Sequence, residues 1–201
     1  MKNHLIVLTS VIFFFFAFTN FINAQFESES GAWHCSQKKQ HAPERVNPVM
    51  GPNSPAHAFD VLKYTMDIDL YNNFDSPYPH DFTSDIVVKF KVDSSLNSIN
   101  LNAYQNSIQI NSVGLAGTAF THQTDMLEIT LDQTYQPGDT VEVSIDYYHK
   151  DVNDGAFYSG SGFIFTDCEP EGARRWFPCW DKPSDKAALE VTAIVPSSVR
   201  L

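Results

Sequence analysis

From Phe59 onward the chain alternates apolar and polar residues with a period of two, and this feature limits its fold more than any other. Successive side chains of a β-strand point to opposite faces, so such alternation predicts strands with one row in a core and the other in water. The clearest apolar rows are Leu62, Tyr64, Met66, Ile68 and Leu70; Ile86, Val88, Phe90 and Val92; Leu127, Ile129 and Leu131; and Val141, Val143, Ile145 and Tyr147.

Turn-forming segments separate these rows. Tyr135–Asp139 contains a Pro-Gly pair and predicts a tight turn that links a hairpin. Tyr71–Phe82 holds two prolines and predicts a long surface loop, while shorter strands are expected at Ile99–Leu101 and Ile108–Val113. No helical period occurs between Phe59 and Lys150. We therefore predict an all-β domain, an antiparallel saddle-shaped sheet or β-sandwich.

The start of the chain differs in composition from the rest. Residues 1–24 combine a basic start, a short apolar run and a small residue at position 24, which predicts a secretory signal peptide cleaved after Ala24. An uncleaved signal anchor is the alternative. Residues 25–57 are polar and proline-rich and predict an extended leader, so the β domain is expected over 58–201. No later segment is apolar enough to span a bilayer. The protein is thus expected to be exported, whether secreted, periplasmic or surface-attached.

Charge and cysteine content restrict the function class. The formal net charge is −11, which argues against nucleic-acid binding because that needs a basic surface. Cys35, Cys168 and Cys179 are an odd number in a chain predicted to be exported, so at least one lacks a partner within it. Cys168 and Cys179 are close enough in sequence to form a disulfide, but two buried thiols are equally compatible with the sequence.

The segment Thr166–Ala187 has the most unusual composition. It concentrates tryptophans, arginines, acidic residues and prolines within a short stretch. From the residues alone it predicts a rigid loop, anchored by aromatic side chains and neutralised by ion pairs, and a purely structural corner fits that description equally well.

This segment resembles the signature near the end of the N-terminal domain of aminopeptidase N-like zinc metallopeptidases, the gluzincin aminopeptidases. The matching residues are Glu169-Pro170, Ala173-Arg174, Phe177-Pro178-Cys179, Asp181, Pro183 and Lys186-Ala187. The strand that opens at Phe59 and the run Gly155-Ala156-Phe157-Tyr158 agree with the same family. The resemblance covers about residues 59–195.

The resemblance implies a substrate-binding role for this segment. In the family, the loop before Glu-Pro reaches into the substrate cleft, where a polar residue receives the free amino terminus of a peptide. That role falls on Glu169, with Asp167 as a neighbouring cleft residue where many relatives have glutamine. A carboxylate suits an ammonium group in a partly dry cleft. Arg174 is expected to be structural, paired with Asp181 or Asp185, and Cys179 to be a packing residue.

Zinc chemistry in this family needs a helical His-Glu-x-x-His motif and a further glutamate. The chain contains no such motif and no two histidines four apart. The resemblance therefore implies that zinc and the catalytic residues belong to a downstream catalytic domain, that this segment alone is inactive, and that it stops before that domain. The implied partners are peptides with a free N-terminus and the chain's own catalytic domain. Two alternatives remain, a stand-alone β-sandwich binding or adhesion module and a homologue without metal that acts as a scaffold.

Overall fold

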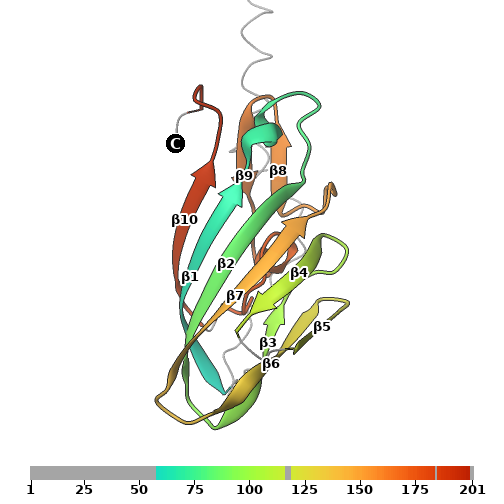
Figure 1. The fold of residues 1–201 in the computed structure, drawn as a ribbon. Helices are drawn as coiled ribbons and strands as arrows, with labels where there is room; N and C mark the ends of the chain where they lie inside the picture. The colour runs from blue at the N-terminus through green and yellow to red at the C-terminus, as the bar shows by residue number, and fades with distance from the viewer. Residues whose placement is uncertain (1–57, 116–118, 184, 200–201) are drawn as a thin grey trace, which may run out of the picture. The chain divides into compact units, whose positions relative to one another are not determined.

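The computed structural model describes residues 58–115, 119–183 and 185–199, which all fall in one compact unit, Val49–Leu201. The predicted signal peptide and the whole predicted leader lie outside the described residues. Within them the secondary structure is β-strand with two 3-10 helices and no α-helix. The described elements are β1 (Phe59–Asp69), η1 (Tyr71–Phe74), β2 (Phe82–Val92), β3 (Leu96–Asn102), β4 (Ile108–Gly114), β5 (Ala119–Gln123), β6 (Met126–Tyr135), β7 (Thr140–His149), β8 (Phe157–Gly160), β9 (Phe163–Thr166), η2 (Ala173–Arg175) and β10 (Ala188–Ile194) (Figure 1).

The strands form three sheets. The largest has the order β10-β1-β2-β7-β4, a second has the order β3-β6-β5, and β8 and β9 form a hairpin. Side chains from the two larger sheets share one hydrophobic core that includes Phe90, Ile145 and Leu127. Three of the four predicted apolar rows are buried as expected, those of β2, β6 and β7. Burial of apolar rows that face each other is the main force that holds such a domain together.

The first strand departs from the predicted alternation. Its pairing with β2 shifts register between Val61 and Lys63, which marks a β-bulge. A bulge adds one residue to a strand and so exchanges the two faces on either side of it. Val61 is consequently buried whereas Leu62 is 38% exposed, and the buried row resumes at Tyr64. The prediction that Leu62 belongs to the core is wrong for this reason.

The Pro-Gly turn is present but does not close a hairpin. Gly138 has a φ of 97°, which favours glycine, and Asp139 N–H donates to the carbonyl of Gln136 at 3.0 Å. The strands on either side lie in different sheets, because β6 pairs with β3 and β5 while β7 pairs with β2 and β4. The turn therefore carries the chain from one layer of the core to the other.

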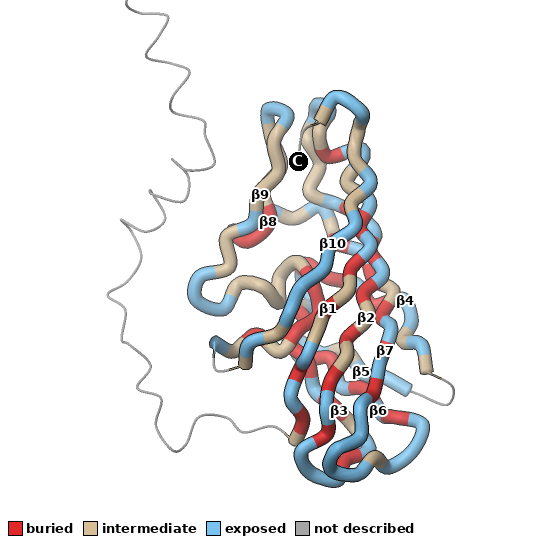
Figure 2. The backbone as a smooth tube through the Cα atoms, turned by 90° about the vertical axis from the view of Figure 1, so that its left-hand side faces the viewer, coloured by how far each residue is buried: buried red, intermediate tan, exposed pale blue. Residues whose placement is uncertain are grey.

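The large sheet is not purely antiparallel. β10 returns to the edge of the sheet and pairs in parallel with β1, with Lys63 opposite Ala188 and Asp69 opposite Ile194. The predicted antiparallel arrangement is wrong at this edge, because the long Thr166–Ala187 segment carries the chain back to the start of β1. Most of β10 is exposed, including Leu189, Val191 and Ile194 (Figure 2).

The predicted surface loop at Tyr71–Phe82 is held in place by hydrogen bonds from a buried side chain of its own. It begins with η1 and includes a cis peptide bond before Pro77, and β2 starts at Phe82. Asn73 is buried and donates from Nδ2 to the carbonyls of Pro79 and Asp81 at 2.8 and 2.9 Å. A buried amide with both donors used stabilises a loop that lacks a ladder of its own.

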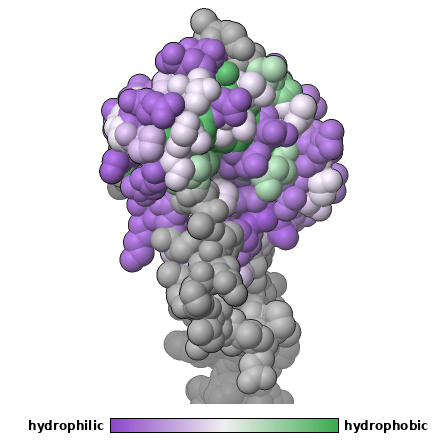
Figure 3. Space-filling model, turned by 90° about the horizontal axis from the view of Figure 1, so that it is seen from below, coloured by the Kyte–Doolittle hydropathy of each residue, from purple (hydrophilic) through white to green (hydrophobic). Residues whose placement is uncertain are grey.

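One face of the domain is polar, in agreement with its acidic composition. The face turned toward the viewer in Figure 3 is mostly hydrophilic with small hydrophobic patches. Among the described residues no helix is long and apolar enough to cross a membrane.

Candidate functional site

The candidate site begins where the β8–β9 hairpin ends. Asp167 follows β9, and its N–H donates to the carbonyl of Ala156, just before β8, at 2.8 Å. The chain then turns: Glu169 N–H donates to Asp167 Oδ1 at 3.4 Å, and Gly172 N–H donates to the carbonyl of Cys168 at 2.9 Å. The bond between Glu169 and Pro170 is cis.

Glycine is required at the end of this turn. A Cβ atom on Gly172 would lie 2.9 Å from the Cα of Cys168, a backbone contact that cannot be relieved by moving a side chain. The turn leaves Asp167 half-buried and Glu169 exposed to solvent. The two predicted cleft residues are thus two positions apart on one turn, joined by the contact from the Glu169 amide to the Asp167 carboxylate.

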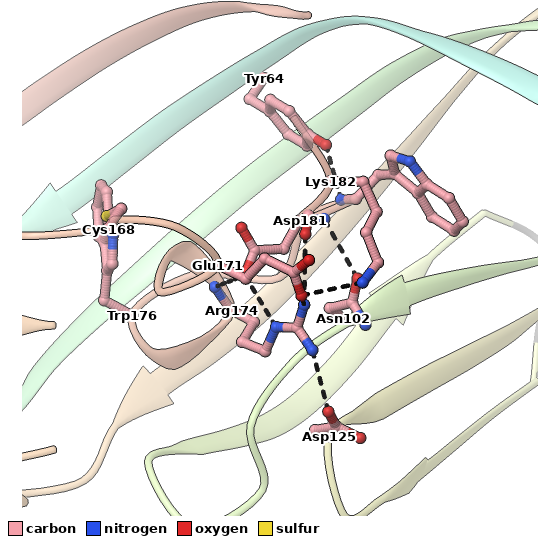
Figure 4. Close-up of polar contacts among 10 residues, drawn as sticks. Tyr64, Asn102, Asp125, Cys168, Glu171, Arg174, Trp176, Asp181 and Lys182 are labelled. Carbon is pink, nitrogen blue, oxygen red and sulfur yellow. Dashed lines mark hydrogen bonds and ion pairs between the residues drawn. The ribbon is translucent and has the colours of Figure 1, made fainter. Parts of the chain in front are cut away.

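Arg174 holds the turn to the body of the domain. Its guanidinium contacts Asp181 through Nε at 2.8 Å, Asp125 through Nη1 at 3.1 Å and Glu171 through Nη2 at 2.8 Å (Figure 4). Glu171 also accepts from Lys182 Nζ at 2.9 Å. A planar guanidinium can satisfy several carboxylates at fixed angles, which a lysine ammonium cannot do in the same way.

The Arg174 network is partly withdrawn from water. The Arg174 side chain is 14% exposed and that of Asp181 is 9% exposed. Burial by itself would lower the pKa of Arg174, but the hydrogen bond and negative charge of Asp181 outweigh burial, and the pKa is raised. Charges in this position stabilise a fold only when they are paired, so Arg174 and Asp181 depend on each other.

Aromatic residues anchor the rest of the segment. Trp180 N–H donates to the Tyr64 hydroxyl at 2.9 Å, and the Tyr147 hydroxyl donates to the carbonyl of Trp176 at 3.1 Å. The ring of Phe177 packs edge-on against Tyr64 with centroids 5.5 Å apart. Strands β1 and β7 therefore fix the second half of the segment, and Asp167 and Glu169 lie at its start, directly after β9.

Comparison with known proteins decides the family. The model of the peptidase M1 N-terminal domain matches residues 62–201, well over half of the chain. The chain belongs to this family. Among curated proteins, aminopeptidase M1-A of Oryza sativa subsp. japonica is 59% identical over 32 residues, which are 16% of this chain and 4% of that protein. Aminopeptidase Q of Acinonyx jubatus is 34% identical over 90 residues, 38% of this chain and 8% of that protein.

Solved structures of M1 zinc metallopeptidases share the fold. A mutant enzyme from Deinococcus radiodurans has a TM-score of 0.62 at 22% identity, covering 70% of this chain and 33% of its own. A mutant of the same enzyme bound to a Tyr-Ser-Ala substrate has a TM-score of 0.60 at 22% identity, with the same coverage. The chain thus spans about a third of these solved chains and a much smaller part of the curated relatives.

The two described cysteines of this M1 N-terminal domain lack the lowered pKa of a reactive thiol. Cys168 and Cys179 are both free thiols, so they are not joined by a disulfide. Cys179 is buried, as its predicted packing role requires, and burial raises its pKa well above the usual value. Cys168 accepts from Trp176 Nε1 at 3.2 Å, and burial raises its pKa as well. A reactive thiol needs the opposite shift.

Metal-ligand chemistry is not available in the part of the chain that the structure describes. No group of three or more His, Cys, Asp or Glu side chains there could hold a metal ion. The described residues therefore do not form a site for zinc, the metal of the solved M1 metallopeptidases.

Sequence reasoning identified one partner of Arg174 and missed the others. Asp181 was expected and is confirmed, but Asp185 instead accepts from the Val61 N–H at 3.3 Å. Asp125 lies 49 residues away in the β5–β6 turn. Sequence spacing carries no signal for a partner so distant, whereas Glu171, three residues before Arg174, is at a spacing that could have suggested it.

Proposed function

We propose that this M1 N-terminal domain forms one wall of the substrate cleft of an exported zinc aminopeptidase, which removes N-terminal residues from peptides. The observation that carries this proposal is the turn with Asp167 and Glu169 at the start of the Thr166–Ala187 signature segment, which Arg174 holds to the domain through Glu171 and Asp181. The contacts of Arg174 with three carboxylates fix the position of this turn on the domain, as a binding surface requires. The family membership supplies the reaction class.

Glu169 is the residue that we propose receives the free amino terminus of the substrate. Its carboxylate is exposed in this domain, so a second surface is needed to enclose it. Once water is excluded, an ammonium group requires a charged acceptor, and a carboxylate offers two oxygens for short hydrogen bonds. Asp167 adds a second negative charge to the same turn and fixes the amide of Glu169.

We propose that zinc is bound by a catalytic domain of the complete protein. When bound in such an enzyme, zinc polarises the scissile carbonyl and activates a water molecule. The residues of this domain would act on the other end of the dipeptide unit: they hold its amino terminus and so set which bond reaches the metal.

The complete protein that carries this domain tests the proposal. It should release the first residue of a peptide with a free amino terminus, lose that activity with a metal chelator and regain it with zinc. The same peptide with an acetylated amino terminus should be at least about 100-fold poorer, because the acetyl group removes the ammonium that the site recognises. Equal cleavage of both peptides would contradict the proposal, as would cleavage that starts inside the peptide.

The export part of the proposal rests on the composition of residues 1–24. Secreted or periplasmic material should begin at Gln25 when its N-terminus is sequenced. A protein found only in the cytoplasm with Met1 retained would contradict export and leave the proposed peptidase role unaffected.

A further inference from the structure

A fully buried histidine lies at the base of the β8–β9 hairpin. His149 ends β7, and its ring packs against the rings of Phe82 and Phe157, which also contact each other. It stacks on Phe82 with centroids 5.0 Å apart and an angle of 9°, and it lies 5.6 Å from Phe157. A titratable ring in such surroundings needs a reason, because burial disfavours its charged form.

The hydrogen bond of His149 determines which tautomer the neutral ring adopts. Nδ1 lies 2.8 Å from the carbonyl oxygen of His80. A carbonyl only accepts, so Nδ1 carries the proton and Nε2 presents a lone pair. Nε2 is buried and has no hydrogen-bond partner, and the nearest carboxylate oxygen is Asp154 Oδ2 at 4.0 Å. Protonation of Nε2 would create a donor, for which the Asp154 carboxylate and the backbone carbonyl of Arg175 are the nearby acceptors.

Asp154 connects this histidine to three other segments. Oδ2 accepts a short hydrogen bond from Ser107, just before β4, and Oδ1 accepts from the Ala156 N–H at 3.1 Å. The backbone carbonyl of Asp154 accepts from Arg175 Nη1 in the signature segment. The Asp154 side chain is 10% exposed, so its position is set by these contacts rather than by water.

From Asp154 a continuous series of hydrogen bonds leads to the candidate site. Ala156, which donates to Asp154, accepts from the Asp167 N–H at 2.8 Å. Asp167 in turn accepts from the Glu169 N–H at 3.4 Å. Three hydrogen bonds thus connect the Asp154 carboxylate to the turn that carries Asp167 and Glu169.

We propose that His149 and Asp154 are a pair of positioning residues, in which protonation of His149 draws Asp154 toward Nε2 and resets the Asp167–Glu169 turn. The pair must close from 4.0 Å to a charge-assisted hydrogen bond of about 2.8 Å. Ser107 and Ala156 move with Asp154 or release it. The turn thus has one geometry with neutral His149 and another with charged His149, which makes the proposed amine site dependent on pH.

The other charged groups around His149 define where this change occurs. His80 faces it through its backbone carbonyl, and the His80 ring lies 3.4 Å from Asp151. Arg175 approaches from the signature segment and contacts the carbonyl of Asp154, while the rings of Phe82 and Phe157 are neutral. Burial lowers the pKa of His149, against the opposing influence of the His80 carbonyl and the Asp154 charge. The change is therefore expected below pH about 6.5, the value for an exposed histidine.

Nuclear magnetic resonance of the 201-residue chain between pH 8 and pH 5 tests the pair. The ring of His149 and the backbone amides of Ala156, Asp167 and Glu169 should shift with one common midpoint below pH about 6.5. His149→Gln, which cannot titrate, should abolish this common step. His122→Gln is the matched control, because His122 also bonds a backbone carbonyl, that of Ala103, but makes no contact with Asp154. It should leave the common step in place.

Three results would overturn the proposal. The first is that the turn amides do not follow the midpoint of His149. The second is that His149 stays neutral until the chain unfolds, and the third is that the common step persists in His149→Gln. If His149→Gln does not fold, Asp154→Asn gives the same decision: His149 should still titrate, and the turn amides should no longer follow it. The readout is geometric, so it stands apart from the proposed amine-binding role, whose failure would appear only in enzyme kinetics.

Discussion

At the scale of single residues, Arg174 is the side chain on which the site depends most. Its guanidinium contacts Glu171 in the turn, Asp125 in the β5–β6 connection and the buried carboxylate of Asp181. Arg174 thereby joins these three parts of the domain. Removing the arginine leaves Asp181, which is 9% exposed, without its charged partner. A buried carboxylate without compensation is among the costlier defects that a point mutation can introduce.

Arg174→Ala is therefore expected to lower the free energy of unfolding by about 3 kcal/mol, measured by urea denaturation. The unfolding free energy of Arg174→Lys should lie between those of the wild type and Arg174→Ala, because lysine keeps the positive charge but lacks the planar set of donors of a guanidinium. The control is Lys89→Ala, which breaks an exposed pair with Glu142 at 2.8 Å and should cost less than about 1 kcal/mol. An equal loss in the alanine variants of Arg174 and Lys89 would contradict the assigned role of Arg174.

Tyr64 gives a second prediction at this scale. Its hydroxyl accepts from the Trp180 N–H at 2.9 Å beneath the signature segment. Tyr64→Phe should cost about 1–3 kcal/mol in urea denaturation, since it leaves a backbone donor without its acceptor. Tyr148→Phe, at a position 37% exposed, is the control and should be nearly neutral. A neutral Tyr64→Phe would mean that the Trp180 amide is satisfied in another way.

At the scale of elements, the sequence predicted which segments are strands better than how they pair. Alternation depends on neighbouring residues, so the buried rows of β2, β6 and β7 could be read directly. Pairing depends on residues far apart in the chain. For this reason the sequence did not predict that the β6–β7 turn joins two different sheets, or that β10 pairs in parallel with β1. The β-bulge in β1 is a further case, because Val61 and Leu62 are both apolar and the pattern does not decide between them.

The bulge makes a prediction that separates the structure from the simple alternation. Val61→Ala should destabilise the domain by about 1–3 kcal/mol, because Val61 is 1% exposed and its removal leaves a cavity. Leu62→Ala should cost less than about 1 kcal/mol, because that side chain is 38% exposed. Thermal and urea unfolding of the two variants check the order, and the reverse order would place the bulge elsewhere.

At the scale of the whole domain, two buried tyrosines set an alkaline limit on stability. Burial raises the pKa of Tyr64 and Tyr147 far above the ordinary value. The neutral form is favoured in the folded state, so their contribution is fully present below pH about 10, the value for an exposed tyrosine, and is lost as the pH rises above it.

Cys168 and Cys179, whose pKa burial also raises, should begin to lower the urea midpoint above pH about 8.5. The two tyrosines should steepen this fall beyond pH about 10. Absorbance of the phenolate near 295 nm should show these two tyrosines ionising only together with unfolding, and Tyr64→Phe should flatten the alkaline fall. Ionisation of every tyrosine at pH about 10 in a chain that stays folded would contradict their burial.

The site as a whole could be predicted only in part from the sequence. The signature segment suggested Glu169 and Asp167 as cleft residues, which stays a prediction, and Asp181, one of the two expected partners of Arg174, is confirmed. Asp125 and Asp154, which contact Arg174 and Arg175, and His149, which contacts His80, were not found, because these contacts join segments that are far apart in the sequence. Local chemistry was visible in the sequence, and the residues that brace it from elsewhere were not.

Glu169→Gln in the complete protein is the most direct test of the central claim, that this domain supplies the acceptor for the substrate's amino terminus. We predict that kcat/KM for an aminoacyl amide with a free amino group falls about 10-fold to 100-fold, because the charge-assisted hydrogen bond to the ammonium is lost. The control Glu128→Gln, an exposed carboxylate on β6, should leave kcat/KM unchanged, and both variants should unfold at the wild-type urea concentration. An unchanged kcat/KM in folded Glu169→Gln would contradict the claim.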